Sequence, residues 1–245
     1  MHSFLLIGQS NMAGRGFLSE AHEIDASRIY TLRNGRWQKM FRPINPDRSS
    51  SGVSLAESFA EAYSKKYDVD VGLICCADGG TKLAQWMPGE LLFDHAVFQA
   101  KLAQRTSEIV GVLWHQGEAD CTEELCATYQ QRFEVMIDAL RKELNLQKVP
   151  VILGGLGDFL EFYPLKDYVH INQALKNIAA NNELIGFASA EGLPGIRDNL
   201  HFNSESLYKL GLRYFDEFEK LHDCYKVLDQ KKITEDVMRS EMELL

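Results

Sequence analysis

One serine lies just after the first apolar run of the chain, among small and amide-bearing residues. The stretch "IGQSNMAGRG", residues 7–16, places Ser10 two positions after Gly8, directly behind the run "FLLI". A serine hydroxyl becomes an effective nucleophile only when a neighbouring base takes its proton. The spacing differs from the GxSxG nucleophile elbow, and a serine at this point can instead cap the helix that follows. This stretch alone therefore leaves both roles of Ser10 open.

A candidate base occurs near the end of the chain, in the loop segment "RDNLHFN". Of the seven histidines, only His201 has an aspartate three residues earlier in a loop, namely Asp198. A turn of this spacing lets the carboxylate accept a hydrogen bond from Nδ1, which leaves Nε2 free to take a serine proton. Imidazole then serves as general base and general acid in turn. The alternative is that Asp198 caps a turn and His201 packs ahead of the last helix.

Two further segments offer hydrogen-bond donors for an oxyanion. Gly79 and Gly80 follow the second apolar run, where their backbone N–H groups can point toward a developing negative charge. A Gly-Gly pair also suits an ordinary tight turn. The side-chain amide of Gln116, after the third apolar run, is another candidate donor. Gln116 and Glu118 can equally fix their own loop by hydrogen bonds, and for Glu118 we favour that structural role.

Several classes of function find no support in the sequence. There is no GxxxxGK[ST] or GxGxxG stretch, and the five cysteines form no CxxC pair. His115, Glu118 and Asp120 lack the HExxH or Cys/His pattern of a metal site. The formal net charge is −9 and no long Lys/Arg run occurs, so nucleic acid is not an expected partner. We expect no cofactor and no metal.

The elements that would position these residues alternate between strands and helices. Five apolar runs predict buried parallel strands: "SFLLIG", "VDVGLICCA", "EIVGVLWH", "VPVILGG" and "ELIGFASA". Helical periodicity fills most of the intervals, and Ser54 with Glu57 forms a candidate capping box. The pattern predicts a doubly wound α/β sheet with right-handed crossovers. Ligands of such sheets bind at the carboxyl ends of the strands, where all the candidate residues lie.

The chain divides into one predicted domain and a tail. Residues 1–222 form the domain, and segment 17–51 within it contains an Asn34-Gly35 pair between β-prone runs, which predicts a hairpin inserted near the rim of the site. Residues 223–245 are charged and helix-prone, without a core face of their own. No run approaches the ~20 apolar residues of a membrane span, and the first residues lack the pattern of a signal peptide. We therefore expect a cytoplasmic protein that does not associate with membranes.

Taken together, the blocks "GQSNMAGRG", "GVSLAESFA", "ADGGTKLAQW", "LWHQGEAD" and "DNLHF" resemble, in order, those of the SGNH hydrolases. The likeness is strongest to carbohydrate esterase family six, the acetylxylan esterases, and to the sialate O-acetylesterase-like domain. The resemblance implies a three-layer, flavodoxin-like α/β/α fold, for which the five runs predict a five-stranded parallel sheet.

The resemblance also implies roles for individual residues. Ser10 matches the nucleophile, and Asp198 and His201 match the block that completes a catalytic triad. The backbone N–H groups of Ser10 and Gly80 match two oxyanion donors. The superfamily takes its third donor from an asparagine, whereas this chain has "HQGEAD", so that Gln116 inherits the role. The residues of the supporting loops are Gln9, Asn11, Gly79 and Glu118.

The expected activity is that of a serine esterase acting through an acyl-enzyme on Ser10. Its substrate would be an acetylated carbohydrate, such as acetylxylan or a related oligosaccharide. The alternatives are a sialate or other small-molecule O-acetylesterase or acyltransferase, and a carbohydrate-binding module that kept the scaffold. Aromatic side chains in loops or after strands are candidates for stacking on a sugar, or for plain packing: Trp37, Trp86, Phe159, Phe162 and Tyr163.

Overall fold

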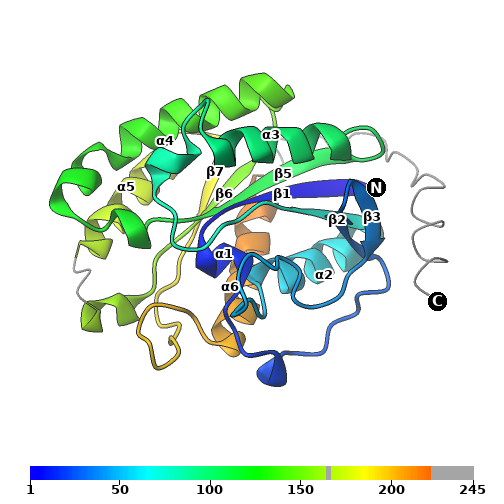
Figure 1. Ribbon diagram of the computed structural model, residues 1–245, viewed down its shortest axis with the longest axis horizontal. Helices are drawn as coiled ribbons and strands as arrows, with labels where there is room; N and C mark the ends of the chain where they lie inside the picture. The colour runs from blue at the N-terminus through cyan, green and yellow to red at the C-terminus, as the bar shows by residue number, and fades with distance from the viewer. Residues whose placement is uncertain (164–166, 222–245) are drawn as a thin grey trace.

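A computed structural model describes residues 1–163 and 167–221, in which a mostly parallel sheet is flanked by helices on both faces (Figure 1). The five apolar runs form five parallel neighbouring strands, as expected. Their bounds are β1 His2–Gly8, β4 Val71–Cys75, β5 Glu108–His115, β6 Val151–Gly154 and β7 Ile185–Ala188. Almost every residue of these strands is buried, which explains their near-continuous apolar sequence.

The sheet has seven strands rather than five, in the order β3-β2-β4-β1-β5-β6-β7. The extra strands, β2 Ile29–Arg33 and β3 Arg36–Lys39, form the predicted hairpin around Asn34 and Gly35, which both have positive φ. Because β2 pairs in parallel with β4, the hairpin extends the sheet rather than standing apart at the rim of the site. The buried Trp37 ring lies over Gly72 of β4, where a Cβ atom would come within 2.6 Å of the ring. This close packing fixes the hairpin on the sheet edge.

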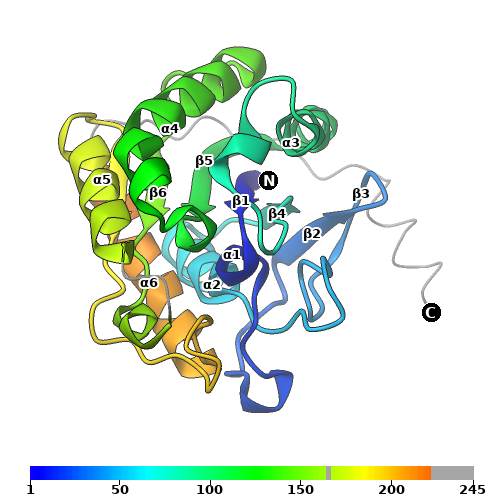
Figure 2. The ribbon, with the colours of Figure 1, turned by 60° about the vertical axis from the view of Figure 1, so that its left-hand side comes forward.

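Five longer helices cover the sheet: α2 Leu55–Tyr67, α3 Leu91–Ala103, α4 Glu123–Leu144, α5 Tyr168–Ala180 and α6 Ser204–Lys220. Helices α3, α4 and α5 pack along one face, while α2 and α6 pack together on the other (Figures 1 and 2). The predicted capping box at the start of α2 is present, with Ser54 and Glu57 each accepting a backbone N–H of the other. The sheet therefore lies as the middle layer of three.

The core under α2 and α6 is rich in aromatic rings. Phe4 of β1 meets Phe59, Tyr63 and Phe218 edge to face, with ring centroids 4.7 to 5.7 Å apart. Leu207, Leu210, Tyr214 and Phe218 of α6 are all buried, whereas Phe215 is only partly buried. The apolar face of α6 thus runs along the helix from Leu207 to Phe218.

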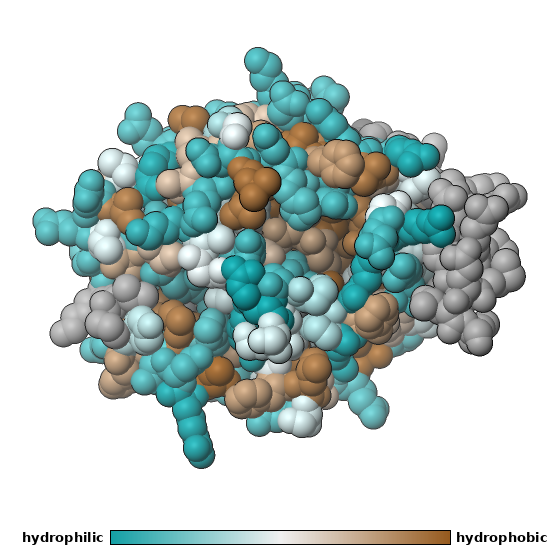
Figure 3. Space-filling model, viewed as in Figure 1, coloured by the Kyte–Doolittle hydropathy of each residue, from teal (hydrophilic) through white to brown (hydrophobic). Residues whose placement is uncertain are grey.

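The surface is mixed, with apolar side chains scattered among hydrophilic ones on the face shown in Figure 3. Within the described ranges, none of the helices has the length and the apolar character that crossing a bilayer would require. The predicted tail, residues 223–245, lies outside the described residues.

Candidate active site

The site forms where β1 ends and the short helix α1, Ser10–Ala13, begins at once. Gly8 makes this possible, because it has φ 130° and a Cβ atom there would lie 2.2 Å from the His115 carbonyl oxygen of β5. Ser10 is the first residue of α1, and the preceding Gln9 occupies the cap position without a side-chain cap bond. Ser10 therefore does not cap the helix, and that alternative reading of the sequence is wrong.

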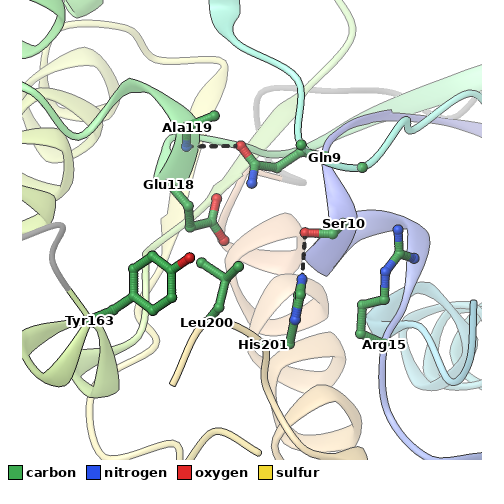
Figure 4. A pocket seen from close by; sticks show the side chains of 10 residues that line it. Gln9, Ser10, Arg15, Glu118, Ala119, Tyr163, Leu200 and His201 are labelled. Atoms are coloured by element: carbon green, nitrogen blue, oxygen red, sulfur yellow. Dashed lines mark hydrogen bonds between the residues drawn. The ribbon is translucent and has the colours of Figure 1, made fainter. Parts of the chain in front are cut away.

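Ser10, His201 and Asp198 form one chain of hydrogen bonds. Ser10 Oγ lies 3.0 Å from His201 Nε2, and His201 Nδ1 lies 2.6 Å from Asp198 Oδ2 (Figure 4 shows the first of these contacts). The other carboxylate oxygen, Asp198 Oδ1, accepts the backbone N–H groups of Leu200 and His201. Asp198 thus closes the turn and orients the His201 ring at the same time. The turn-capping role and the ring-orienting role that the sequence suggested for Asp198 are therefore compatible.

The charge on Asp198 is supported by these contacts. Burial raises the pKa of this carboxyl, but the His201 ring and the two backbone N–H groups outweigh burial, and the pKa lies below the ordinary aspartate value. Asp198 is therefore ionised at neutral pH and accepts a hydrogen bond from the His201 Nδ1–H. This leaves Nε2 as the nitrogen that can receive a proton from Ser10.

Asn11 holds the histidine loop against α1. Its Nδ2 donates to the Leu200 carbonyl at 3.2 Å, and its Oδ1 accepts the Phe202 N–H at 3.1 Å, so the two bonds bracket His201. The Asn11 Nδ2 also donates to Glu118 Oε1 at 2.5 Å. Asn11 therefore links α1 directly to the histidine loop and to the 3-10 helix that begins at Glu118, which agrees with the supporting part expected of both residues.

The loop with Gly79 and Gly80 lies beside Ser10. Gly80 has φ 77°, and within the described ranges its N–H makes no hydrogen bond. The Gly79 N–H donates to Asp47 Oδ2 at 2.8 Å, and Asp47 accepts two hydrogen bonds from Arg15, at 2.7 and 3.0 Å. The Arg15 and Asp47 side chains are only 6% and 5% exposed, so this is a buried ion pair. Because Asp47 also accepts the Gly79 N–H, the ion pair fixes the loop that contains Gly79 and Gly80.

Gln116 does not serve as a donor in the pocket, contrary to expectation. Its Nε2 donates to the Thr81 carbonyl at 3.0 Å and to Asp120 Oδ2 at 2.7 Å, while its Oε1 accepts from Tyr129. The side chain is fully buried and both amide hydrogens are used. The alternative, that Gln116 fixes its own loop, is the correct one.

A different amide faces the pocket. Gln9 Oε1 accepts the Ala119 N–H at 3.4 Å, which orients the amide so that Nε2 points into the cavity (Figure 4). Within the part of the chain that the structure describes, Gln9 Nε2 has no hydrogen-bond acceptor. From the sequence we expected Gln9 only in a supporting loop. The direction of its side-chain amide depends on Ala119, which is 110 residues away, and no sequence pattern connects the two.

The pocket has a volume of about 420 Å³ and opens to solvent above Ser10. Its lining comprises Gln9, Ser10, Arg15, Gly79, Gly80, Glu118, Ala119, Tyr163, Leu200 and His201. Of the five aromatic residues suggested for sugar stacking, Tyr163 is the one that lines the pocket, as far as the described residues extend. Trp37 and Trp86 are buried in the core, Phe159 packs on Phe202, and Phe162 is 77% exposed outside it. No cluster of three or more metal-ligating side chains occurs among the residues described.

A mostly parallel sheet flanked by helices, with this arrangement at the carboxyl ends of its strands, has the fold of the SGNH-type lipase/acylhydrolase structures. Residues 1–220 match the model of the carbohydrate esterase, sialic acid-specific acetylesterase family, and the chain belongs to this family. It is therefore a carboxylic ester hydrolase of the carbohydrate acetylesterase type, as the resemblance implied.

Similarity to individual proteins agrees with the assignment to this family. A probable carbohydrate esterase of Arabidopsis thaliana is 29% identical over 232 residues, which cover 85% of this chain and 86% of the relative. The crystal structure of a protein from Arabidopsis thaliana superposes with a TM-score of 0.80 at 26% identity, covering 91% of this chain and 99% of that one.

Two more distant structures share the fold. A carbohydrate acetylesterase from Xanthomonas citri has a TM-score of 0.69 at 16% identity, covering 92% of this chain and 57% of the other. A lipase/acylhydrolase from Enterococcus faecalis has a TM-score of 0.53 at 16% identity, covering 89% and 96%.

Proposed function

We propose that this chain is a serine esterase that removes acetyl groups from O-acetylated carbohydrates through an acyl-enzyme on Ser10. The observation that carries the proposal is the hydrogen-bonded chain from Ser10 Oγ through His201 to Asp198, at the floor of an open pocket. The family places the chain among carbohydrate esterases, and the pocket supplies the chemistry. We further propose that residues 1–222 act as one esterase domain.

In the proposed reaction, His201 Nε2 takes the proton of Ser10 as Oγ attacks the acetyl carbonyl carbon. Asp198 keeps the Nδ1–H oriented and stabilises the imidazolium. The tetrahedral intermediate collapses when the imidazolium protonates the leaving sugar oxygen, which leaves an acetyl group on Ser10. His201 then deprotonates a water molecule that attacks the acetyl carbonyl, and the imidazolium returns the proton to Ser10 Oγ as the second tetrahedral intermediate releases acetate.

The oxyanion of both intermediates needs donors fixed in advance. We assign this role to the backbone N–H groups of Ser10 and Gly80 and to the side-chain Nε2 of Gln9. The Gly80 N–H and the Gln9 Nε2 have no partner within the described ranges, and both residues line the pocket. Gln9 thus takes the place that the sequence had suggested for Gln116.

The acetylated sugar is proposed to be acetylxylan or a related oligosaccharide. The modest volume of the pocket, about 420 Å³, and the polar side chains of Gln9, Ser10 and His201 in its lining favour a short acyl group on a hydroxylated substrate over a long acyl chain. A sialate O-acetylesterase is the alternative within the same chemistry. It is supported by the description of the family.

The test is acetate release from acetylated xylo-oligosaccharides and from an aryl acetate, by the wild type and by Ser10→Ala. We expect release from both substrates, and a loss of at least about three orders of magnitude in the variant. A Ser10→Ala protein that folds normally and keeps full activity would refute the acyl-enzyme. Release from the aryl acetate alone would retain the chemistry and reject the xylan assignment.

A further inference from the structure

The loop that contains Gly80 is bonded on its far side to Asp120, a fully buried carboxylate. The Leu83 N–H, at the start of a short 3-10 helix, donates to Asp120 Oδ2 at 2.7 Å. The side chain of Gln116 bridges the same two segments, because its Nε2 donates to Asp120 Oδ2 at 2.7 Å and to the Thr81 carbonyl at 3.0 Å. The first and the third residue after Gly80 are therefore tied to this carboxylate, one through Gln116 and the other directly.

Asp120 is itself held in one orientation. Its Oδ1 accepts a hydrogen bond from Arg132 Nη2 of α4 at 3.1 Å, and the Arg132 side chain is only 20% exposed. Arg132 Nη2 also donates to the Leu125 carbonyl at 2.9 Å. Both carboxylate oxygens thus have donors, with α4 on one side and the Gly80 loop on the other. Hydrogen bonds to a charged acceptor are among the strongest in proteins, so Asp120 is suited to fixing a loop.

Gly80, in contrast, makes little contact of its own. Its φ is 77°, a Cβ atom placed there would meet nothing within 4 Å, and its N–H forms no hydrogen bond within the described part of the chain. Glycine also has more backbone freedom than any other residue. The direction of the Gly80 N–H therefore depends on its neighbours, namely on the bond from Gly79 to Asp47 before it and on the bonds of Thr81 and Leu83 after it.

We propose that Asp120 is a positioning residue for the oxyanion, because its Oδ2 holds the Gly80 N–H in the direction that the tetrahedral intermediate requires. This inference rests on the proposed function and extends it to a residue outside the described pocket lining. A donor stabilises developing charge only if it is fixed in advance, and a displacement of about 1 Å can cost about two orders of magnitude in rate. A purely structural Asp120 would change stability without changing how the site binds an oxyanion.

The variant Asp120→Asn keeps the shape of the side chain but has one acceptor oxygen for donors on two sides, and its NH₂ group faces the others. We expect kcat for an aryl acetate to fall roughly a hundredfold. The KM should change little, because the Gly80 N–H acts mainly on charge that develops in the transition state. Steady-state kinetics will measure both constants.

Inhibition by phenylboronic acid gives a second readout that stability alone does not move. Ser10 Oγ forms a bond to boron, its proton passes to His201, and the tetrahedral boronate anion places an oxygen where the oxyanion of the ester reaction forms. The inhibition constant of Asp120→Asn should therefore rise in proportion to its loss of kcat/KM.

Two control variants separate charge and stability from positioning. Asp138→Asn removes the same charge from an exposed position on α4 and should keep the wild-type constants. Leu175→Ala opens a cavity under α5, which packs on α4, β6 and β7, and typically costs about 2–5 kcal/mol of stability. It should lower the melting temperature while kcat and the inhibition constant stay near the wild-type values.

A folded Asp120→Asn protein with wild-type kcat and boronate inhibition would overturn the proposal. A fall in kcat with unchanged boronate inhibition would also overturn it, because the oxyanion site would then be intact. If Asp120→Asn does not fold, Gln116→Met, which removes the bond to the Thr81 carbonyl, takes its place with the same expectations. Inactivity of the wild type on an aryl acetate and on acetylated sugars would instead reject the proposed function itself.

Discussion

At the scale of single residues, Gln9 and Gln116 show how one residue type takes two roles according to its partners. Both are amides placed just after a buried strand. Gln116 is surrounded by Thr81, Asp120 and Tyr129, which use both of its amide hydrogens and bond its oxygen. Among the residues that the structure describes, the Gln9 side chain bonds only to the Ala119 N–H, which leaves its amide nitrogen facing the pocket.

Gln9→Ala should therefore impair the chemical step more than substrate binding. Loss of one oxyanion donor typically costs about two to three orders of magnitude in kcat. We expect a decrease of this size for an aryl acetate, with KM changed little, because the donor acts mainly on charge that develops in the transition state. Steady-state kinetics, with thermal unfolding as a check on folding, will measure it. A decrease confined to KM would assign Gln9 to ground-state binding instead.

At the scale of elements, the sequence predicts most of what positions the site. Near-continuous Val, Ile and Leu predicted the five parallel strands, and the helical periodicity of residues 52–67 predicted α2 with its cap. The hairpin was visible through Asn34 and Gly35, but its docking on β4 depends on Trp37 meeting Gly72, a contact between distant residues. The site likewise combines contacts between sequence neighbours, which the sequence predicts, with contacts between distant residues, which it does not. Asp198 and His201 are neighbours in sequence, whereas Arg15 and Asp47 are 32 residues apart.

The Arg15–Asp47 pair joins the segment after α1 to the loop between β3 and α2, and Asp47 also holds the loop after β4 through the Gly79 N–H, so its loss should loosen these segments. Breaking a buried ion pair typically costs about 3–5 kcal/mol, because one charge remains buried without a partner. We expect Asp47→Asn to lower the free energy of unfolding by about this amount at neutral pH. Asp68→Asn is the matched control, since Asp68 pairs with Arg28 at a site where its side chain is 94% exposed, and it should change little.

The acid dependence of this effect follows from the pKa of Asp47. Burial raises that pKa, but Arg15, Ser51 and the Gly79 N–H outweigh burial, and the pKa lies below the ordinary aspartate value. A carboxylate with a lowered folded pKa stabilises the protein fully above its unfolded value, about 3.9, and loses this contribution as the pH falls through the folded value. Urea unfolding should show the difference between wild type and Asp47→Asn shrinking below about pH 4. A difference that grows with acidity would contradict the ion pair.

At the scale of the whole molecule, charge decides which esters reach the site easily. The chain has a formal net charge of −9, and the pocket combines the Glu118 carboxylate with an arginine that Asp47 neutralises. Fields of this kind slow the approach of anions and leave neutral substrates unaffected. The repulsion acts over a Debye length of about 30 Å at 0.01 M salt and about 8 Å at 0.15 M, so salt should relieve it.

The matched pair of 4-acetoxybenzoate and its methyl ester tests this expectation, because the two aryl acetates differ chiefly by one charge. We expect kcat/KM for the anion to rise severalfold as salt increases over that range, while kcat/KM for the neutral ester stays nearly constant. A kcat/KM for the anion that instead falls with salt would mean that Arg15 attracts substrate despite Asp47, and would favour a carboxylate-bearing sugar as the natural substrate.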